Sequence, residues 1–125
     1  MGFIKFITGR IKAMGYATKG AIILLKTEPS IQVQATIAIF MTIAGFYFNI
    51  TATEWIAQTF CIGLVMGIEG MNTTAEAIAD FIHPDFHEKI GHIKDIAAGA
   101  VVITAIAAAV VGFIIYTPYV VAFFE

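Results

Sequence analysis

The sequence predicts an all-α membrane protein in which an N-terminal amphipathic surface helix precedes three transmembrane helices. The 125-residue chain is 59% hydrophobic and only 13% charged, and its mean hydropathy of +0.88 is far above that of an ordinary soluble domain. Three separate apolar stretches each supply the roughly 20 residues that a bilayer core requires. We expect a single membrane-embedded domain over residues 1–125, because the length leaves no room for a separate soluble catalytic domain.

Residues 1–27 are predicted to form the surface helix. Basic side chains recur at every seventh position, which keeps them on one helix face: Lys5, Lys12, Lys19 and Lys26. Apolar side chains gather on the opposite face: Phe3, Ile7, Ile11 and Met14. Such a helix is suited to the plane of an anionic membrane surface. Because no apolar run typical of a cleavable signal appears here, we expect the segment to remain in the mature protein.

The apolar stretches place the transmembrane helices at about residues 31–50, 55–80 and 94–117. Pro29 is well placed to open the first, because proline fits the first helical position, and Pro118 is expected to end the third. The third stretch is rich in alanine and contains two glycines, which lets helices approach closely. Because three helices hardly enclose a polar site from lipid, we expect a homo-oligomer.

Basic residues set the expected orientation in the membrane. They occur in the N-terminal segment and around the second connection, residues 83–93, whereas the first connection, residues 49–54, and the C-terminal tail have none. By the positive-inside rule, the N-terminus and the 83–93 connection are expected on the cytoplasmic side and the C-terminus outside. The net charge of −2 says little about partners, and we expect no nucleic-acid partner.

The second stretch carries a polar stripe on one helix face, composed of Glu69, Asn72, Glu76 and Asp80. A carboxylate within a membrane-length helix is costly and usually marks function. Counted inward from Trp55 at the outer side, Glu76 falls near the cytoplasmic interface and Glu69 lies about 10 Å deeper. Asp80 is expected to be a solvated or capping residue at the end of the span. The candidate site therefore centres on Glu69 and Glu76.

Two other segments bring charged residues to the same cytoplasmic level. Glu28 precedes the first span, and Lys94 and Asp95 open the third. Mg²⁺ is typically bound by one or two carboxylates together with phosphates and water, and Glu28 and Glu76 supply such carboxylates. A lysine at the water edge suits a nucleotide phosphate, and the deeper Glu69 is placed to act as a base on a hydroxyl from the bilayer. These residues indicate phosphoryl transfer from a soluble donor to a lipid alcohol.

In these residues the chain resembles the small bacterial integral-membrane diacylglycerol kinases and undecaprenol kinases. The resemblance covers almost the whole chain and centres on the Glu-x-x-Asn-x-x-x-Glu spacing of residues 69–76, with Lys94-Asp95 downstream. Other similar positions lie within residues 15–20, at Glu28, at Glu54-Trp55 and in residues 83–87. The resemblance implies a homotrimer with composite sites in the bacterial inner (cytoplasmic) membrane, with Mg-ATP as donor and a lipid primary hydroxyl as acceptor.

The resemblance also implies a role for each site residue. Glu69 matches the catalytic base of the family, and Glu28 and Glu76 match its metal-binding carboxylates. Nucleotide contacts fall on Tyr16, Glu28, Glu76, Asp85, Phe86, His87, Lys94 and Asp95, and lipid contacts fall on Glu69, Asn72 and Lys12. The implied acceptor is diacylglycerol, which gives phosphatidic acid, with undecaprenol as the alternative. Departures at Ser30 and Gln32, where the family often has Asn and Arg, bear on the choice of acceptor.

Other functions stay open from the residues alone. A small oligomeric ion or proton transporter would use Glu69 as a relay, but it would be expected to carry polar residues through the depth of its spans, and the outer halves here are nearly free of ionisable groups. A purely structural assembly protein is the third option. His83 and His87 would suit a transition metal on a helix, but Pro84 between them favours a solvated loop. The chain has no P-loop or protein-kinase motif, which excludes those kinase folds.

Overall fold

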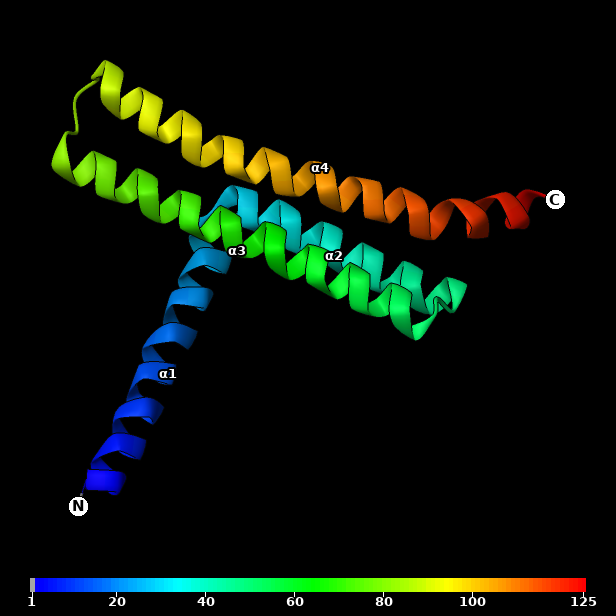
Figure 1. Cartoon of the computed structure of the whole chain (residues 1–125), viewed down its shortest axis with the longest axis horizontal. Coiled ribbons are helices and arrows are strands. Elements are labelled where there is room, and N and C mark those ends of the chain that lie inside the picture. Colours follow the sequence, from blue (N-terminus) through cyan, green and yellow to red (C-terminus); the bar gives the residue numbers. More distant parts are fainter. Residues whose placement is uncertain (1) are drawn as a thin grey trace.

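The computed structural model describes residues 2–125 and contains, over this range, four α-helices and no strand (Figure 1). The helices are α1 (Gly2–Thr27), α2 (Pro29–Phe48), α3 (Ala52–Ile82) and α4 (Glu88–Phe124). The all-α fold class is confirmed. Helices α2, α3 and α4 lie alongside one another, and α1 leaves this bundle at a steep angle (Figure 1).

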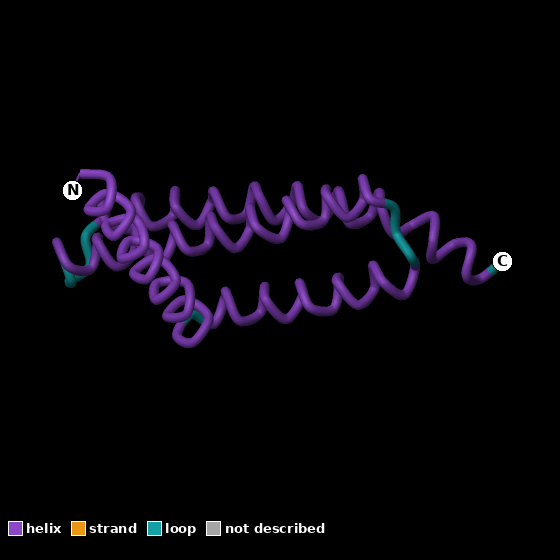
Figure 2. Tube along the Cα trace, turned by 90° about the horizontal axis from the view of Figure 1, so that it is seen from below, coloured by secondary structure: helices purple, strands orange, loops and turns teal. Residues whose placement is uncertain are grey.

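Helix α3 holds the bundle together. It packs along α4 and also contacts α2, whereas α2 and α4 make few contacts with each other; Figure 2 shows α2 set apart from the other two helices. Helix α1 is exposed over its whole described length apart from the half-buried Leu24. Its apolar face has no partner within residues 2–125, which suits a helix that lies on a membrane surface.

The turn between α2 and α3 is fixed by its cap residues. Asn49 adopts the left-handed conformation with φ 51°, and the next N–H, that of Ile50, donates to the carbonyl of Gly45 to close α2. Helix α3 then opens with a capping box. The Glu54 N–H donates to Thr51 Oγ1 at 3.2 Å, and the Thr51 N–H donates to Glu54 Oε2 at 2.8 Å.

Close to this turn, α2 and α3 approach so closely that only glycine fits at position 45. A Cβ on Gly45 would lie 2.6 Å from Trp55 Cη2 and 3.1 Å from Ile50 Cδ1. The Phe46 ring also packs against that of Trp55, with the ring centroids 4.9 Å apart. This contact fixes the two helices at the end of the bundle that is predicted to face outward.

A neutral polar cluster joins the three helices one turn further in. Gln58 is only 5% exposed, and its Nε2 donates to the carbonyl of Met41 at 3.0 Å. The Tyr116 hydroxyl lies 2.5 Å from Gln58 Oε1 and 3.1 Å from the same carbonyl. Within a bundle, such contacts act as interhelical hydrogen bonds. None of these groups is charged at neutral pH, so the sequence pattern did not predict this cluster.

Helix α4 begins at Glu88, before the predicted start near residue 94. His87 is its N-cap, and the His87 Nδ1 accepts a hydrogen bond from the Lys89 N–H at 3.0 Å. This cap satisfies one of the N–H groups that a helix start leaves unpaired, so the helix extends further into the connection. The remaining link between α3 and α4 is residues 83–87.

The expected end of the third span at Pro118 is wrong, because α4 continues through Pro118 to Phe124. Proline removes one backbone donor, but helices in membrane proteins tolerate this loss when other contacts hold the segment. Here the Tyr119 hydroxyl donates to Glu54 Oε2 at 2.6 Å, and the Tyr119 ring stands 5.9 Å from that of Phe48. Both contacts join the last turns of α4 to the start of α3 and the end of α2.

Two helices of the described range, α2 and α4, are long and apolar enough to cross a membrane. Few of their residues are buried within the single chain, so their apolar side chains are available to lipid or to other copies. Helix α3 carries four carboxylates, and it is not one of these two helices. The third transmembrane helix and the trimer stay predictions.

Candidate active site

The centre of the site is the carboxylate of Glu69, the most buried ionisable group of α3. Glu69 is 7% exposed and lies where α3 faces α2. The Gln34 Nε2 of α2 donates to Glu69 Oε2 at 3.0 Å. This position agrees with the prediction that Glu69 is the deeper carboxylate of the stripe. The partner Gln34 was missed, although a glutamine within an apolar stretch is itself a signal of a buried polar contact.

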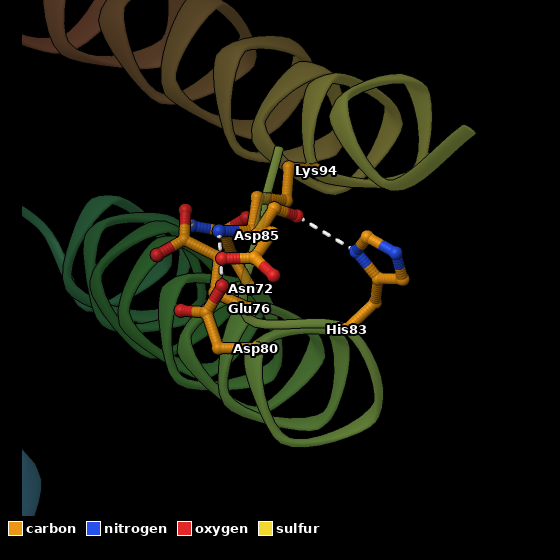
Figure 3. Close-up of polar contacts among 6 residues, drawn as sticks. All are labelled: Asn72, Glu76, Asp80, His83, Asp85 and Lys94. Atoms are coloured by element: carbon orange, nitrogen blue, oxygen red, sulfur yellow. Dashed lines mark hydrogen bonds and ion pairs between the residues drawn. The ribbon is translucent and has the colours of Figure 1, made fainter. Parts of the chain in front are cut away.

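The rest of the polar stripe follows Glu69 along the same face of α3 toward its C-terminal end (Figure 3). Asn72 Nδ2 lies 3.5 Å from Glu76 Oε1, and Glu76 is exposed. Asn72 Oδ1 is shielded from solvent and has no hydrogen-bond partner within residues 2–125. The stripe thus changes from a buried carboxylate to an exposed one over about two helical turns.

Glu28 reaches α3 from the start of α2. It is the N-cap residue of α2, and the Thr73 hydroxyl of α3 donates to Glu28 Oε2 at 3.5 Å. Thr73 is one residue from Asn72 and about one turn from Glu76, so the Glu28 carboxylate lies near the Glu76 part of the stripe. Thr73 is a second contact that the sequence analysis did not identify.

Asp80 is exposed to solvent, as predicted. Its Oδ1 also pairs with Lys94 Nζ of α4 at 2.6 Å, a contact that was not predicted (Figure 3). The Asp80 side chain is 58% exposed and that of Lys94 34% exposed, so water screens the pair. The end of the stripe therefore meets a cation from α4, and the neighbouring Asp95 is exposed.

The connection between α3 and α4 contains three of the residues predicted to contact a nucleotide: Asp85, Phe86 and His87. Phe86 is 92% exposed. The His83 Nδ1 donates to the Asp85 carbonyl at 2.7 Å, which folds the connection back on itself. The segment is not helical, as predicted for a solvated loop. Within residues 2–125 no three His, Cys, Asp or Glu side chains are grouped closely enough to hold a metal ion.

Two predicted contacts lie on α1, and the structure does not bring them to the stripe of the same chain. Tyr16 is 76% exposed, and Lys12 is also exposed. The C-terminal end of α1 does reach α3, because a Cβ on Gly70 would lie 3.0 Å from Leu24 Cδ1. The start of α1, in contrast, points away from the bundle (Figure 1).

An apolar cavity lies between α2, α3 and α4 beside the buried carboxylate. Its volume is about 360 Å³. Gln34, the partner of Glu69, belongs to its wall, and the other lining side chains include Ile37, Met41, Cys61, Val65 and Ile115. A hydrocarbon chain is the kind of ligand that such walls accept. The site therefore combines a buried carboxylate, an exposed carboxylate and cation, and an adjoining apolar space.

The chain is similar to two groups of lipid kinases. The family model for prokaryotic diacylglycerol kinase matches residues 15–116. The chain is 31% identical over 107 residues to the undecaprenol kinase of Bacillus subtilis, a match that covers 86% of this chain and 87% of that protein. It is 28% identical over 100 residues to the diacylglycerol kinase of Escherichia coli, a match that covers 80% of this chain and 82% of that protein. The diacylglycerol kinase of Synechocystis is 32% identical over 100 residues, covering 78% of this chain and 56% of that protein.

Proposed function

This chain belongs to the prokaryotic diacylglycerol kinase family, and on that premise we propose that it transfers the γ-phosphoryl group of ATP to the primary hydroxyl of diacylglycerol, giving phosphatidic acid. Its relatives are named as kinases of lipid alcohols, which makes the chain a lipid kinase. The observation that carries the proposal is a buried carboxylate, Glu69, held between apolar helices and followed along one face by the exposed Glu76.

In the proposed reaction Glu69 takes the proton of the lipid hydroxyl while the hydroxyl oxygen attacks the γ-phosphorus. The new oxygen–phosphorus bond forms as the bond from the γ-phosphorus to the β–γ bridging oxygen breaks, and ADP leaves. Because this reaction requires mainly positioning and charge neutralisation, few protein groups are needed beyond the base and the cations. Burial of Glu69 also keeps bulk water away, which favours transfer to the lipid over hydrolysis of ATP.

Glu28 and Glu76 are the residues we propose for Mg²⁺. The hydrogen bond from Thr73 ties Glu28 to the helix that carries Glu76, and Glu76 is exposed at the end where a soluble nucleotide would approach. Two carboxylates together with phosphate and water oxygens suit the octahedral preference of this ion. When bound, Mg²⁺ neutralises charge on the phosphate oxygens.

Lys94 is the cation that we propose for the nucleotide phosphates. To reach them it would exchange its ion pair with Asp80 for a phosphate oxygen. Because the pair is largely exposed and screened by water, this exchange costs little. The remaining nucleotide contacts are proposed for exposed residues at the same end of the bundle, namely Asp95, Asp85, Phe86 and His87.

We also propose that the active form is a homotrimer with sites shared between copies. Lys12 and Tyr16, which we propose for the lipid and the nucleotide, lie on the part of α1 that points away from the bundle of its own chain. A second copy that presents its bundle to this helix would complete the site. The proposed location is the bacterial inner membrane, crossed three times, with the N-terminus in the cytoplasm.

The identity of the acceptor needs a direct test, because the undecaprenol kinase and the diacylglycerol kinases among the relatives are similar to this chain to nearly the same degree. Purified protein in mixed micelles is given Mg-ATP with diacylglycerol or undecaprenol, and phosphorylated lipid is measured. We expect phosphatidic acid, and we expect loss of activity when EDTA removes Mg²⁺. Faster turnover with undecaprenol would assign the second acceptor. If neither lipid is phosphorylated, the kinase proposal is wrong.

A further inference from the structure

The Gln34 side chain forms a hydrogen bond only with the carboxylate that we propose as the base. Its Nε2 donates to Glu69 Oε2 at 3.0 Å, and this is the amide's one hydrogen bond within residues 2–125. The Gln34 Oε1 is shielded from solvent and has no partner there. Buried amide oxygens are rarely left unpaired, so packing of α2 against α3 alone does not explain this side chain.

A comparison of the half-buried Gln34 with the buried Gln58 shows the difference. Gln58 uses both ends of its amide, with its Nε2 on the Met41 carbonyl and its Oε1 facing the Tyr116 hydroxyl. It thereby joins three helices and leaves nothing unpaired, as expected of a structural contact. The Gln34 amide, in contrast, binds only the Glu69 carboxylate, and its oxygen has no partner. Gln58 therefore joins helices, whereas Gln34 contacts the proposed base.

The contact also fixes which carboxylate oxygen is available. Glu69 Oε2 is occupied by the Gln34 amide, whereas Glu69 Oε1 accepts no hydrogen bond within residues 2–125. A carboxylate held by one oxygen cannot rotate freely, so its second oxygen is kept in one direction. Gln34 and Gln58 both line the apolar cavity between α2, α3 and α4. Glu69 is not a lining residue, and the Gln34 amide joins its carboxylate to the cavity wall.

We propose that Gln34 is a positioning residue for Glu69. It holds Oε2 so that Oε1 faces the hydroxyl of the lipid acceptor and receives its proton during phosphoryl transfer. The inference rests on the proposed function, since it assigns a role to Gln34 within that reaction. Gln34 does not itself exchange a proton or contact the phosphate. Replacement of Gln34 should therefore reduce kcat and leave the KM for Mg-ATP unchanged.

The test compares Gln34→Leu with the wild-type protein in mixed micelles, with Mg-ATP and the lipid that the wild type phosphorylates. Because a hydrogen bond to a charged group is lost, we expect kcat to fall roughly ten-fold or more, with the KM for Mg-ATP within about two-fold. Tyr116→Phe is the control, because it removes an interhelical hydrogen bond to Gln58 without changing a residue that lines the cavity; we expect its kcat to stay within about two-fold of wild type. Gln34→Met, which is unbranched and adapts to its surroundings, repeats the test if Gln34→Leu does not fold.

A double-mutant cycle with Glu69→Asp shows whether Gln34 acts through the base. The shorter side chain draws the carboxylate away from the Gln34 amide, so Gln34→Leu should then change kcat by less than about two-fold. The proposal is wrong if Gln34→Leu keeps the wild-type kcat, or if its effect is equally large beside Glu69→Asp. If the wild-type protein phosphorylates neither lipid, the proposed function itself is wrong. The proposed role of Gln34 is then wrong as well, because it depends on that function.

Discussion

Replacing Gly45 by alanine should weaken the contact that fixes α2 against α3. The new Cβ would lie 2.6 Å from Trp55 Cη2 and 2.8 Å from Trp55 Cζ2, about 1 Å closer than carbon atoms approach at contact. The rigid indole ring cannot give way easily, because Phe46 packs against it. Overpacking of this kind costs about 2 kcal/mol, and the better helix propensity of alanine returns about 1 kcal/mol. The net loss of unfolding free energy should be about 1 kcal/mol.

The assay is reversible unfolding of the purified protein in mixed micelles, driven by SDS and followed by circular dichroism. Gly63→Ala serves as the control, since a Cβ at Gly63 meets nothing within 4 Å in the chain and its α3 position gains helix propensity. We expect Gly45→Ala to be less stable than wild type and Gly63→Ala to be at least as stable as wild type. A Gly45→Ala protein as stable as the wild type would refute the reasoning that the Trp55 ring fills the space over Gly45.

Three further outcomes follow from the polar contacts. Tyr116→Phe removes the hydroxyl that faces Gln58, and SDS unfolding should show a loss of about 0.6 kcal/mol, the average for such contacts in a membrane protein; an unchanged stability would contradict the contact. Asp80→Asn frees Lys94 from its exposed pair, so steady-state kinetics should show a KM for Mg-ATP equal to that of wild type or up to about five-fold lower, with kcat preserved; loss of turnover would place Asp80 in the catalytic machinery. The Tyr119 hydroxyl and the Thr51 N–H hold the pKa of Glu54, which precedes the predicted second span, below its ordinary value of 4.5. Because the pKa of Glu54 is lower in the folded protein, the charged carboxylate adds to the free energy of unfolding above pH 4.5. This contribution is lost as the pH falls through the lowered pKa. Thermal unfolding of the wild type should therefore lose more stability between pH 5 and pH 3 than that of Glu54→Gln, and equal losses would contradict this.

The sequence predicted the helical fold and the burial of Glu69 because both depend on local pattern. A long apolar stretch forms a helix whatever packs against it, and residues spaced at three to four positions share one helix face. The contacts that depend on helix register were not predictable in this way. Gln34 meets Glu69, and Thr73 meets Glu28, only because α2 and α3 are aligned by the short capped turn at Asn49 and by the Trp55 contact.

The helix ends were missed for a related reason. Pro118 normally predicts a helix end, but tertiary contacts of Tyr119 outweigh the missing backbone donor. His87 lies in the connection, as predicted, and its side chain also caps α4, which extends the helix start to Glu88. The pair of Asp80 with Lys94 was not predictable, because the sequence gives the depth of Lys94 but not the direction of its side chain toward α3. Lys12 and Tyr16 are not brought to the stripe by their own chain, and their place in a site depends on the second copy that we propose.

The decisive measurement is the turnover of Glu69→Gln beside that of the wild type, with Mg-ATP and each lipid alcohol in mixed micelles. Glutamine has the size of glutamate and can still form a hydrogen bond with Gln34, so SDS unfolding should show that the fold is kept. Unlike glutamate, it cannot accept a proton from the lipid hydroxyl. We expect kcat for lipid phosphorylation to fall by about 10²–10⁴-fold, with the KM for Mg-ATP little changed. A Glu69→Gln protein that phosphorylates lipid at the wild-type rate would contradict the role of Glu69 as the base.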